Sequence, residues 1–163
     1  MSVVILALAA CTPPLETLAA RCRAGEQSSC RTLAEAAEHG RDAALRKAAV
    51  ERLEDQPLLA ELARSARDER VRQGAVARIT NQALLAEVAK YGNHPFVRRA
   101  AVERITDQTV LADVARNAAH LSARSVAVDN LTDQELLAEF ARADNPSLCR
   151  VAAQRLKALR EQR

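Results

Sequence analysis

The chain repeats itself every 26 residues from Arg46 onward, and this period constrains its fold more than any other feature. Three sets of evenly spaced residues make the repeat visible. They are Arg46, Arg72, Arg98 and Arg124; Val50, Val76, Val102 and Val128; and Gln56, Gln82, Gln108 and Gln134. Self-similarity at a fixed period of this size indicates a solenoid, in which short units stack on one another. Because a solenoid builds surfaces rather than deep pockets, the sequence predicts the shape of this protein more clearly than its partner.

The composition predicts helices as the repeating elements. Apolar residues make up 48% of the 163 residues but aromatic residues only 2%, so the core must consist of small aliphatic side chains. Alanine and leucine are the best helix formers, and such side chains suit closely packed helices. Only four glycines and five prolines are present, and no alternating run predicts a strand. We therefore expect an all-helical chain of one domain.

Each unit contains two predicted helices. The apolar residues Val71, Ala75, Val76 and Ile79 form one helical stripe. This pattern predicts a first helix over Arg46–Leu53, Arg72–Ile79, Arg98–Ile105 and Arg124–Leu131. A second helix follows at once, with apolar residues at Leu58, Leu59, Leu62 and Ala63 in the earliest unit and at Leu84, Leu85, Val88 and Ala89 in the next.

Polar residues at fixed places predict how the second helices begin and what they expose. Threonines precede them and are expected at the N-cap, and Thr132 with Glu135 forms a capping-box pattern. The capping threonines are Thr80, Thr106 and Thr132. An acidic and a basic residue, three positions apart, recur on each second helix and predict solvated pairs within that helix. The acidic set is Glu61, Glu87, Asp113 and Glu139, and the basic set is Arg64, Lys90, Arg116 and Arg142.

The repeated phrase Val-Arg-x-x-Ala-Val-x-Arg-Ile, followed by a cap and Leu-Leu-Ala-x-Val-Ala, resembles HEAT-like repeats and the leucine-rich repeat variant family. The resemblance covers residues 41–159, with a capping helix over about 146–159 and a polar tail at 160–163. It implies an all-α, right-handed α-solenoid of stacked two-helix repeats. Such families serve mostly as scaffolds and binding surfaces, so the resemblance also implies a protein partner.

The arginine series beginning at Arg46 has two interpretations. In HEAT-like repeats an arginine at this place commonly bonds loop carbonyls and acidic groups between units, which implies a structural role. The guanidinium group suits a partner's carboxylates equally well. The functional alternative is an acidic partner held on the concave face by Arg72, Arg98, Arg99 and Arg104. Cys149 and Asn130 interrupt the two arginine series, which weakens the case for a continuous basic groove.

Large side chains are few, and those near the loops are candidates for binding because interface hot spots favour aromatic groups. Tyr91 and Phe96 flank one loop. Phe96, next to Val97, is expected to fill the gap between two units, and a binding role in the loop is the alternative. The complete set of candidate partner-binding residues is Arg72, Arg98, Arg99, Arg104, Tyr91 and Phe96.

The N-terminal segment predicts a membrane anchor. An apolar run ends in Leu8, Ala9, Ala10 and Cys11, which resembles the lipobox of bacterial lipoproteins. The resemblance implies a signal over residues 1–11, with lipid attached to Cys11 and export to the outer membrane. The nine-residue segment Ser2–Ala10 is too short to span a bilayer, which needs about 20 residues. The alternative is a buried first helix with an ordinary cysteine.

Two further cysteines lie on either side of Gly25 in the segment 12–40. The predicted helices over 18–23 and 30–39, joined by a tight turn, would bring Cys22 and Cys30 close together. This stretch resembles a Sel1-like repeat, which implies a disulfide between them, and an exported compartment would preserve it. Cys149 remains as a single thiol. An iron–sulfur cluster on Cys11, Cys22 and Cys30 is a weak alternative, because no Cys-x-x-Cys is present.

The remaining patterns exclude more than they suggest. No catalytic motif, phosphate loop or metal-ligand spacing is present, and His39, His94 and His120 do not form a zinc pattern. We expect no enzyme activity, no cofactor and no metal. The net charge of +3 combines 24 basic with 21 acidic residues, which disfavours nucleic acid.

Two functional hypotheses follow. The first is a non-catalytic scaffold or subunit of a bacterial envelope complex on the periplasmic side, lipid-anchored through Cys11. The second is a cytoplasmic HEAT-like module that binds an acidic protein or nucleic acid through its arginines. An enzyme on a HEAT-like scaffold rests on analogy of fold alone.

Overall fold

The computed structural model describes residues 13–161 and contains eleven α-helices within them. The predicted all-helical class is confirmed. In each repeat unit the first helix has an odd number and the second helix has an even number. The last helix, α11, also has an odd number. In chain order they are α1 (Leu15–Arg23), α2 (Gln27–His39), α3 (Ala43–Arg52), α4 (Gln56–Ser65), α5 (Glu69–Arg78), α6 (Gln82–Tyr91), α7 (Pro95–Glu103), α8 (Gln108–Asn117), α9 (Leu121–Asn130), α10 (Gln134–Phe140) and α11 (Pro146–Glu161).

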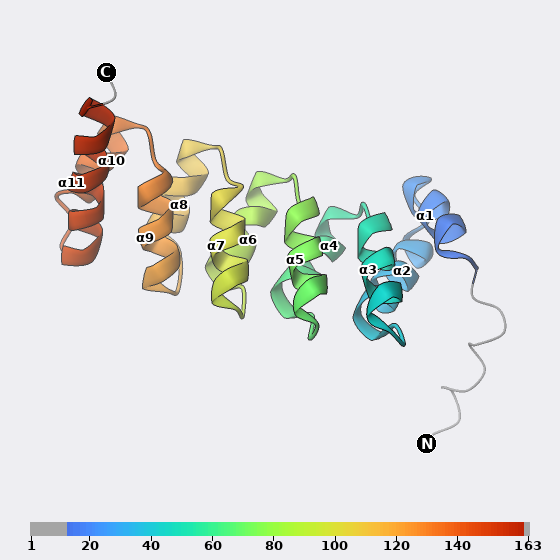
Figure 1. The fold of residues 1–163 in the computed structure, drawn as a ribbon. Helices are drawn as coiled ribbons and strands as arrows, with labels where there is room; N and C mark the ends of the chain where they lie inside the picture. Colours follow the sequence, from blue (N-terminus) through green and yellow to red (C-terminus); the bar gives the residue numbers. More distant parts are fainter. Residues whose placement is uncertain (1–12, 162–163) are drawn as a thin grey trace.

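The helices stack in two layers (Figure 1). Helices α3, α5, α7, α9 and α11 pack side by side in one layer, which we call the odd row, and α2, α4, α6 and α8 pack in the even row behind it. Each even helix also packs against the odd helix that follows it in the chain. Loops from an even helix to the next odd helix lie along one edge of the stack, which we call the inter-unit edge. The stacked helical repeat predicted from the 26-residue period is therefore present.

The core runs along the stack between the two rows. The repeated valines Val50, Val76, Val102 and Val128 are buried, with at most 3% of their surface exposed. Leucine and isoleucine at the ends of the odd helices complete this core, including Leu53, Ile79 and Leu131, none of which is exposed at all. Small aliphatic side chains thus allow the close approach of the rows that the composition predicts.

A glutamine at the start of α4, α6 and α8 binds the unit that follows. Gln56 Oε1 accepts hydrogen bonds from the backbone N–H of Thr80 at 2.7 Å and of Asn81 at 3.3 Å. Gln82 and Gln108 bind the following threonine in the same way, at 2.8 and 2.7 Å. The even spacing of the glutamines therefore reflects a structural contact between units.

The predicted threonine N-caps are wrong by one residue. The N-cap residues of α6, α8 and α10 are Asn81, Asp107 and Asp133, whose side chains accept the first helical N–H groups. The preceding threonines turn to the glutamine of the previous unit instead, with Thr132 Oγ1 3.2 Å from Gln108 Oε1. The capping box of Thr132 and Glu135 is absent, since Asp133 Oδ1 accepts from the Glu135 N–H at 2.9 Å.

Two of the bases predicted to pair within the even helices pair between units instead. Lys90 binds Asp113, and Arg116 Nη2 lies 2.8 Å from Glu139 Oε2. These hydrogen bonds hold the pKa values of Asp113 and Glu139 below their ordinary range. Stacking brings a base on one helix closer to the acid on the next helix than to the acid on its own helix.

The first hairpin precedes the regular units. Helices α1 and α2 pack against each other through a turn in which Gly25 has a φ of 90°, a value that glycine adopts readily. The sulfurs of Cys22 and Cys30 lie 2.08 Å apart, at disulfide distance, and both residues are buried. The expected proximity of these cysteines across the hairpin is confirmed. Cys11 lies outside the described residues.

Candidate protein-binding surface

The repeated arginines lie inside the inter-unit edge. Arg72 and Arg98 are only 8% and 5% exposed. Arg72 Nη1 donates to the carbonyls of Ala66 and Arg67, both at 2.7 Å, and Arg98 Nη1 donates to the Gly92 carbonyl at 2.8 Å. These bonds support the structural interpretation of the series. Because these two arginines are covered, the four candidate arginines do not form a continuous exposed basic surface.

The other two candidate arginines belong to the same part of the stack but not to the same site. Arg99 is exposed on α7 and pairs with Glu103 on its own helix, with Nε 2.7 Å from Oε1. This hydrogen bond raises the pKa of Arg99. Arg104 follows α7 and donates from Nη2 to the Ile79 carbonyl at 3.0 Å, at the opposite edge from Arg98. The structure therefore separates Arg104 from the loop that Arg98 holds.

Arg46 shows what completes an arginine of this series. Its Nη1 donates to the Gly40 carbonyl at 2.9 Å, and its Nε and Nη2 donate to Asp68 Oδ2 at 3.0 and 2.7 Å. Asp68 also caps α5, because Oδ1 accepts from the Arg70 N–H at 2.8 Å. The bond from Arg46 is the main cause that lowers the pKa of Asp68. One carboxylate thus closes the junction between α3 and α5.

The exposed large hydrophobic side chains gather at the inter-unit edge. Among residues 13–161, Tyr91 is 57% exposed, Phe96 51% and Leu121 45%. Tyr91 ends α6, Phe96 is the second residue of α7 and Leu121 begins α9. We call these three residues the aromatic edge, after Tyr91 and Phe96. The expected burial of Phe96 between units is wrong, because its side chain lies at the start of a helix where the stack is open to solvent.

A groove extends from the aromatic edge between α7 and α9. It has a volume of about 250 Å³ and is lined by Phe96, Pro95, Ala123 and Val126 together with Arg98, Arg99 and Ser122. Its two charged lining residues are both arginines. Sequence reasoning identified Phe96 and the arginines but missed Leu121. The alignment of the units could have found it, because leucine stands there at a helix start that other units fill with Ala43, Glu69 or Pro95.

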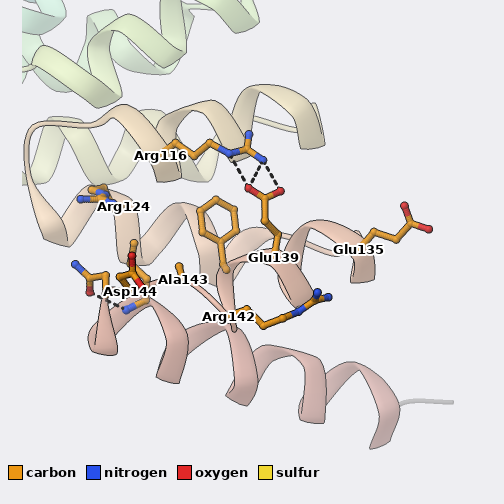
Figure 2. Close-up of a pocket in the computed structure, with 10 residues that line it drawn as sticks. Arg116, Arg124, Glu135, Glu139, Arg142, Ala143 and Asp144 are labelled. Carbon is orange, nitrogen blue, oxygen red and sulfur yellow. Dashed lines mark hydrogen bonds and ion pairs between the residues drawn. The ribbon is translucent and has the colours of Figure 1, made fainter.

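A larger hollow lies at the C-terminal end of the stack (Figure 2). It has a volume of about 660 Å³ and opens beside α10, which has seven residues where the other even helices of the repeat have ten. Arg116 extends from α8 to Glu139 and lies over the Phe140 ring, 5.5 Å from its centre. Acidic and basic side chains both line this hollow, and Arg116 is already paired with Glu139. The lining therefore favours neither an anionic nor a cationic ligand.

The described residues give no further chemical site. No helix within residues 13–161 is long and apolar enough to cross a membrane. In the same residues, no group of three or more His, Cys, Asp or Glu side chains is placed to hold a metal ion. Cys149 stands where the series has arginine and takes over part of its role, since Sγ lies 2.9 Å from the Ala141 carbonyl oxygen.

The aromatic edge and its groove are therefore the best candidates for a binding surface. No protein-family model, curated protein or solved structure matches the chain.

Proposed function

We propose that this chain is a non-catalytic scaffold that binds a partner protein through the aromatic edge. The observation that carries this proposal is the clustering of Tyr91, Phe96 and Leu121 at two consecutive inter-unit loops, each about half exposed. Interfaces are enriched in aromatic side chains such as those of Tyr91 and Phe96. Leu121 adds apolar surface whose removal from water is favourable. Every other large apolar side chain within residues 13–161 is buried or half-buried. Exposing these three adds nothing to folding stability.

The loop between Tyr91 and Phe96 is held in place by the buried side chain of Arg98. Arg98 Nη1 donates to the carbonyl of Gly92, the first residue of this loop, and the arginine itself is buried. A loop fixed in this way loses little conformational freedom when a partner binds, which favours affinity. In this proposal Arg98 positions the aromatic edge, and Tyr91, Phe96 and Leu121 make the contacts.

The proposed place of action is the bacterial cell envelope. The lipobox-like residues ending at Cys11 suggest a lipid anchor on the periplasmic side of the outer membrane, and the scaffold would then belong to an envelope complex. The proximity of Cys22 and Cys30 suits this proposal, because disulfides persist in oxidising compartments.

Crosslinking in the native host tests the proposed surface. A photo-crosslinking residue replaces Tyr91, Phe96 or Leu121 in turn, and matched controls carry it at the exposed positions Lys47 and Lys157. We expect the three edge positions to capture one common protein that the controls do not capture. Equal capture from all five positions, or none from the edge, would refute the proposal.

The intact mass of the native protein tests its location. Loss of residues 1–10, added lipid and a gain of two hydrogen masses on reduction are the expected results. A full-length, unmodified mass with all four thiols free would refute the envelope location and favour the cytoplasmic alternative.

A further inference from the structure

The junction between α3 and α5 shows which group binds the Nε and Nη2 edge of an arginine in the series that begins at Arg46. Arg46 uses Nη1 for a loop carbonyl and turns its Nε and Nη2 edge to the carboxylate of Asp68 in the next inter-unit loop. A carboxylate is the best acceptor for that edge, because both N–H groups point the same way. This internal pair serves as a template for the equivalent junctions.

Histidine replaces the aspartate in the next two units. His94 and His120 stand 26 and 52 residues after Asp68, at the same place before α7 and α9. Neither histidine side chain caps its helix. Arg72 Nε and Arg98 Nε, which would face these positions, are buried and have no hydrogen-bond partner within residues 13–161. A buried donor that stays unpaired destabilises the fold.

At Arg98 this unpaired edge coincides with a groove. Arg98 lines the cavity between α7 and α9, where Phe96 and Val126 supply apolar surface and where no residue of the described chain contributes a carboxylate to the lining. The volume of about 250 Å³ lies below the roughly 300 to 1,000 Å³ of small-molecule pockets, so it suits one or two side chains. The opposite edge of this junction also departs from the pattern. There Asn130 replaces an arginine, and its buried Nδ2 has no partner among the described residues.

We infer that the groove between α7 and α9 binds the side-chain carboxylate of an aspartate or glutamate in a partner protein. The carboxylate accepts hydrogen bonds from Nε and Nη2 of Arg98, as Asp68 does from Arg46. An apolar neighbour of that acidic residue packs on Phe96 and Val126. This inference rests on the proposed function, since it specifies the chemistry of the partner that docks at the aromatic edge.

The acidic group reaches Arg98 only if the atoms that cover Nε move, and we assign this movement to Phe96. Nε is covered in the structure, whereas Phe96, at the rim of the groove, has half of its surface in solvent. An exposed side chain changes rotamer within nanoseconds, so Phe96 can turn aside and then cover the bound segment. The same movement explains why a phenylalanine is useful at a position where the other units have Ala44, Arg70 or Ser122.

Nuclear magnetic resonance of the full chain tests the inference with two peptides. The probe is acetyl-Leu-Asp-Leu-amide, and its matched control is acetyl-Leu-Asn-Leu-amide. We expect the aspartate peptide to shift the Arg98 Nε–Hε signal and to bind about tenfold more tightly, because hydrogen bonds to a charged acceptor are stronger than those to a neutral amide and tenfold corresponds to about 1.4 kcal/mol. Equal binding of the two peptides, or shifts that spare Arg98, would overturn the inference.

Two histidine variants provide a matched pair. His120→Asp supplies an internal carboxylate to Arg98, so binding of the aspartate peptide should fall at least about tenfold although the fold stays intact. His94→Asp supplies the same group to Arg72 and should leave the peptide affinity unchanged. The opposite pattern, or equal loss in both variants, would overturn the inference.

The outcomes separate this inference from the proposed function. Crosslinks from the aromatic edge combined with equal binding of both peptides would refute only the carboxylate site. Selective binding of the aspartate peptide without crosslinks would refute only the proposed docking of a partner at the aromatic edge.

Discussion

The junction between α3 and α5 and the junction between α7 and α9 share one architecture but differ in how they are closed. In the first, Asp68 completes Arg46 and caps α5. In the second, His120 does neither for Arg98 and α9, and Asn130 leaves the opposite edge without its arginine. The first junction is saturated with internal hydrogen bonds, whereas the second keeps buried donors unpaired.

This difference shows how a repeat protein can carry a specific site. In a stack, each junction has the same structural task, so a residue that departs from the series is not needed for stacking alone. Functional sites are the places where proteins violate local rules of stability. Both departures occur at the junction that also has the apolar groove and two residues of the aromatic edge. The contrast can be tested by removing the bonds of the first junction or adding them to the second.

The largest expected effect comes from removing the closure of the first junction. Asp68→Ala loses the cap of α5 and leaves the Nε and Nη2 edge of Arg46 unpaired. We expect the free energy of unfolding to fall by about 3 kcal/mol, because the cost of losing the cap adds to the cost of leaving a partly buried cation unpaired. Urea unfolding measures the change.

Asp42→Ala is the control for the cap alone. Asp42 caps α3 by accepting from the Leu45 N–H at 2.7 Å, and no arginine within residues 13–161 bonds to it. We expect its removal to cost about 1 kcal/mol. Equal losses in the two variants would show that the bond to Arg46 contributes nothing.

The second prediction adds the missing closure. His120→Asp should cap α9 and complete Arg98, so we expect the free energy of unfolding to rise by about 2 kcal/mol. His120→Asn adds the cap without the charge and should give about half of this gain. Thermal and urea unfolding of both variants measure the effect. A loss of stability in His120→Asp would contradict the equivalence of Asp68 and His120.

The sequence alone predicts the stack because its dominant signals are local and repeated. The stripe of Val71, Ala75, Val76 and Ile79 is buried as expected, and α5 begins three residues before the predicted Arg72 and ends at Arg78. The period then places equivalent helices side by side. No knowledge of distant contacts is needed for these conclusions.

The errors concern residues whose partners lie in the next unit. Threonine, asparagine and aspartate are all good N-cap residues. Gln56, which belongs to the preceding unit, binds Thr80 and leaves Asn81 to cap the helix. The ion pairs cross between units for the same reason. A pattern within one helix cannot show which neighbour a side chain will choose after stacking.

The candidate site was predictable only in part. The sequence identifies Tyr91 and Phe96 as unusual, but exposure at the loop edge depends on how adjacent units meet, so the burial of Phe96 was predicted wrongly and Leu121 was missed. The replacement of Asp68 by His94 and His120 is visible in the aligned units. Its meaning requires the bond between Arg46 and Asp68, which is a contact across 22 residues.

The third prediction restores the opposite edge of the second junction. Arg78 Nε donates to the Leu53 carbonyl at 3.1 Å and Arg104 Nη2 to the Ile79 carbonyl at 3.0 Å, whereas Asn130 has no such bond in the described part of the chain. Asn130→Arg should reach the Ile105 carbonyl and raise the free energy of unfolding by about 1 kcal/mol.

Arg104→Asn is the mirror-image control for this edge. It should lower the free energy of unfolding by a similar amount of about 1 kcal/mol. If Asn130→Arg were destabilising while Arg104→Asn behaved as expected, the two positions would not be equivalent, and the second junction would differ from the others in its backbone as well.

The smallest expected effect separates charge from hydrogen bonding at the first junction. Asp68→Asn keeps the cap and a neutral acceptor but loses the charge facing Arg46, and we expect the free energy of unfolding to fall by about 0.5 to 1 kcal/mol near pH 7.

The bond from Arg46 lowers the pKa of Asp68 in the folded protein below its ordinary value of 3.8. The folded state therefore binds this proton less readily than the unfolded state does, and the stability from this charge is present above the unfolded pKa. It is lost as the pH falls through the folded pKa, so the difference between the parent protein and Asp68→Asn should close at low pH. Urea unfolding of both proteins across this range measures the difference, and His120→Asp compared with His120→Asn should reproduce it at the second junction. A difference that persists at low pH would show that the Asp68 side chain acts through its shape and not through its charge.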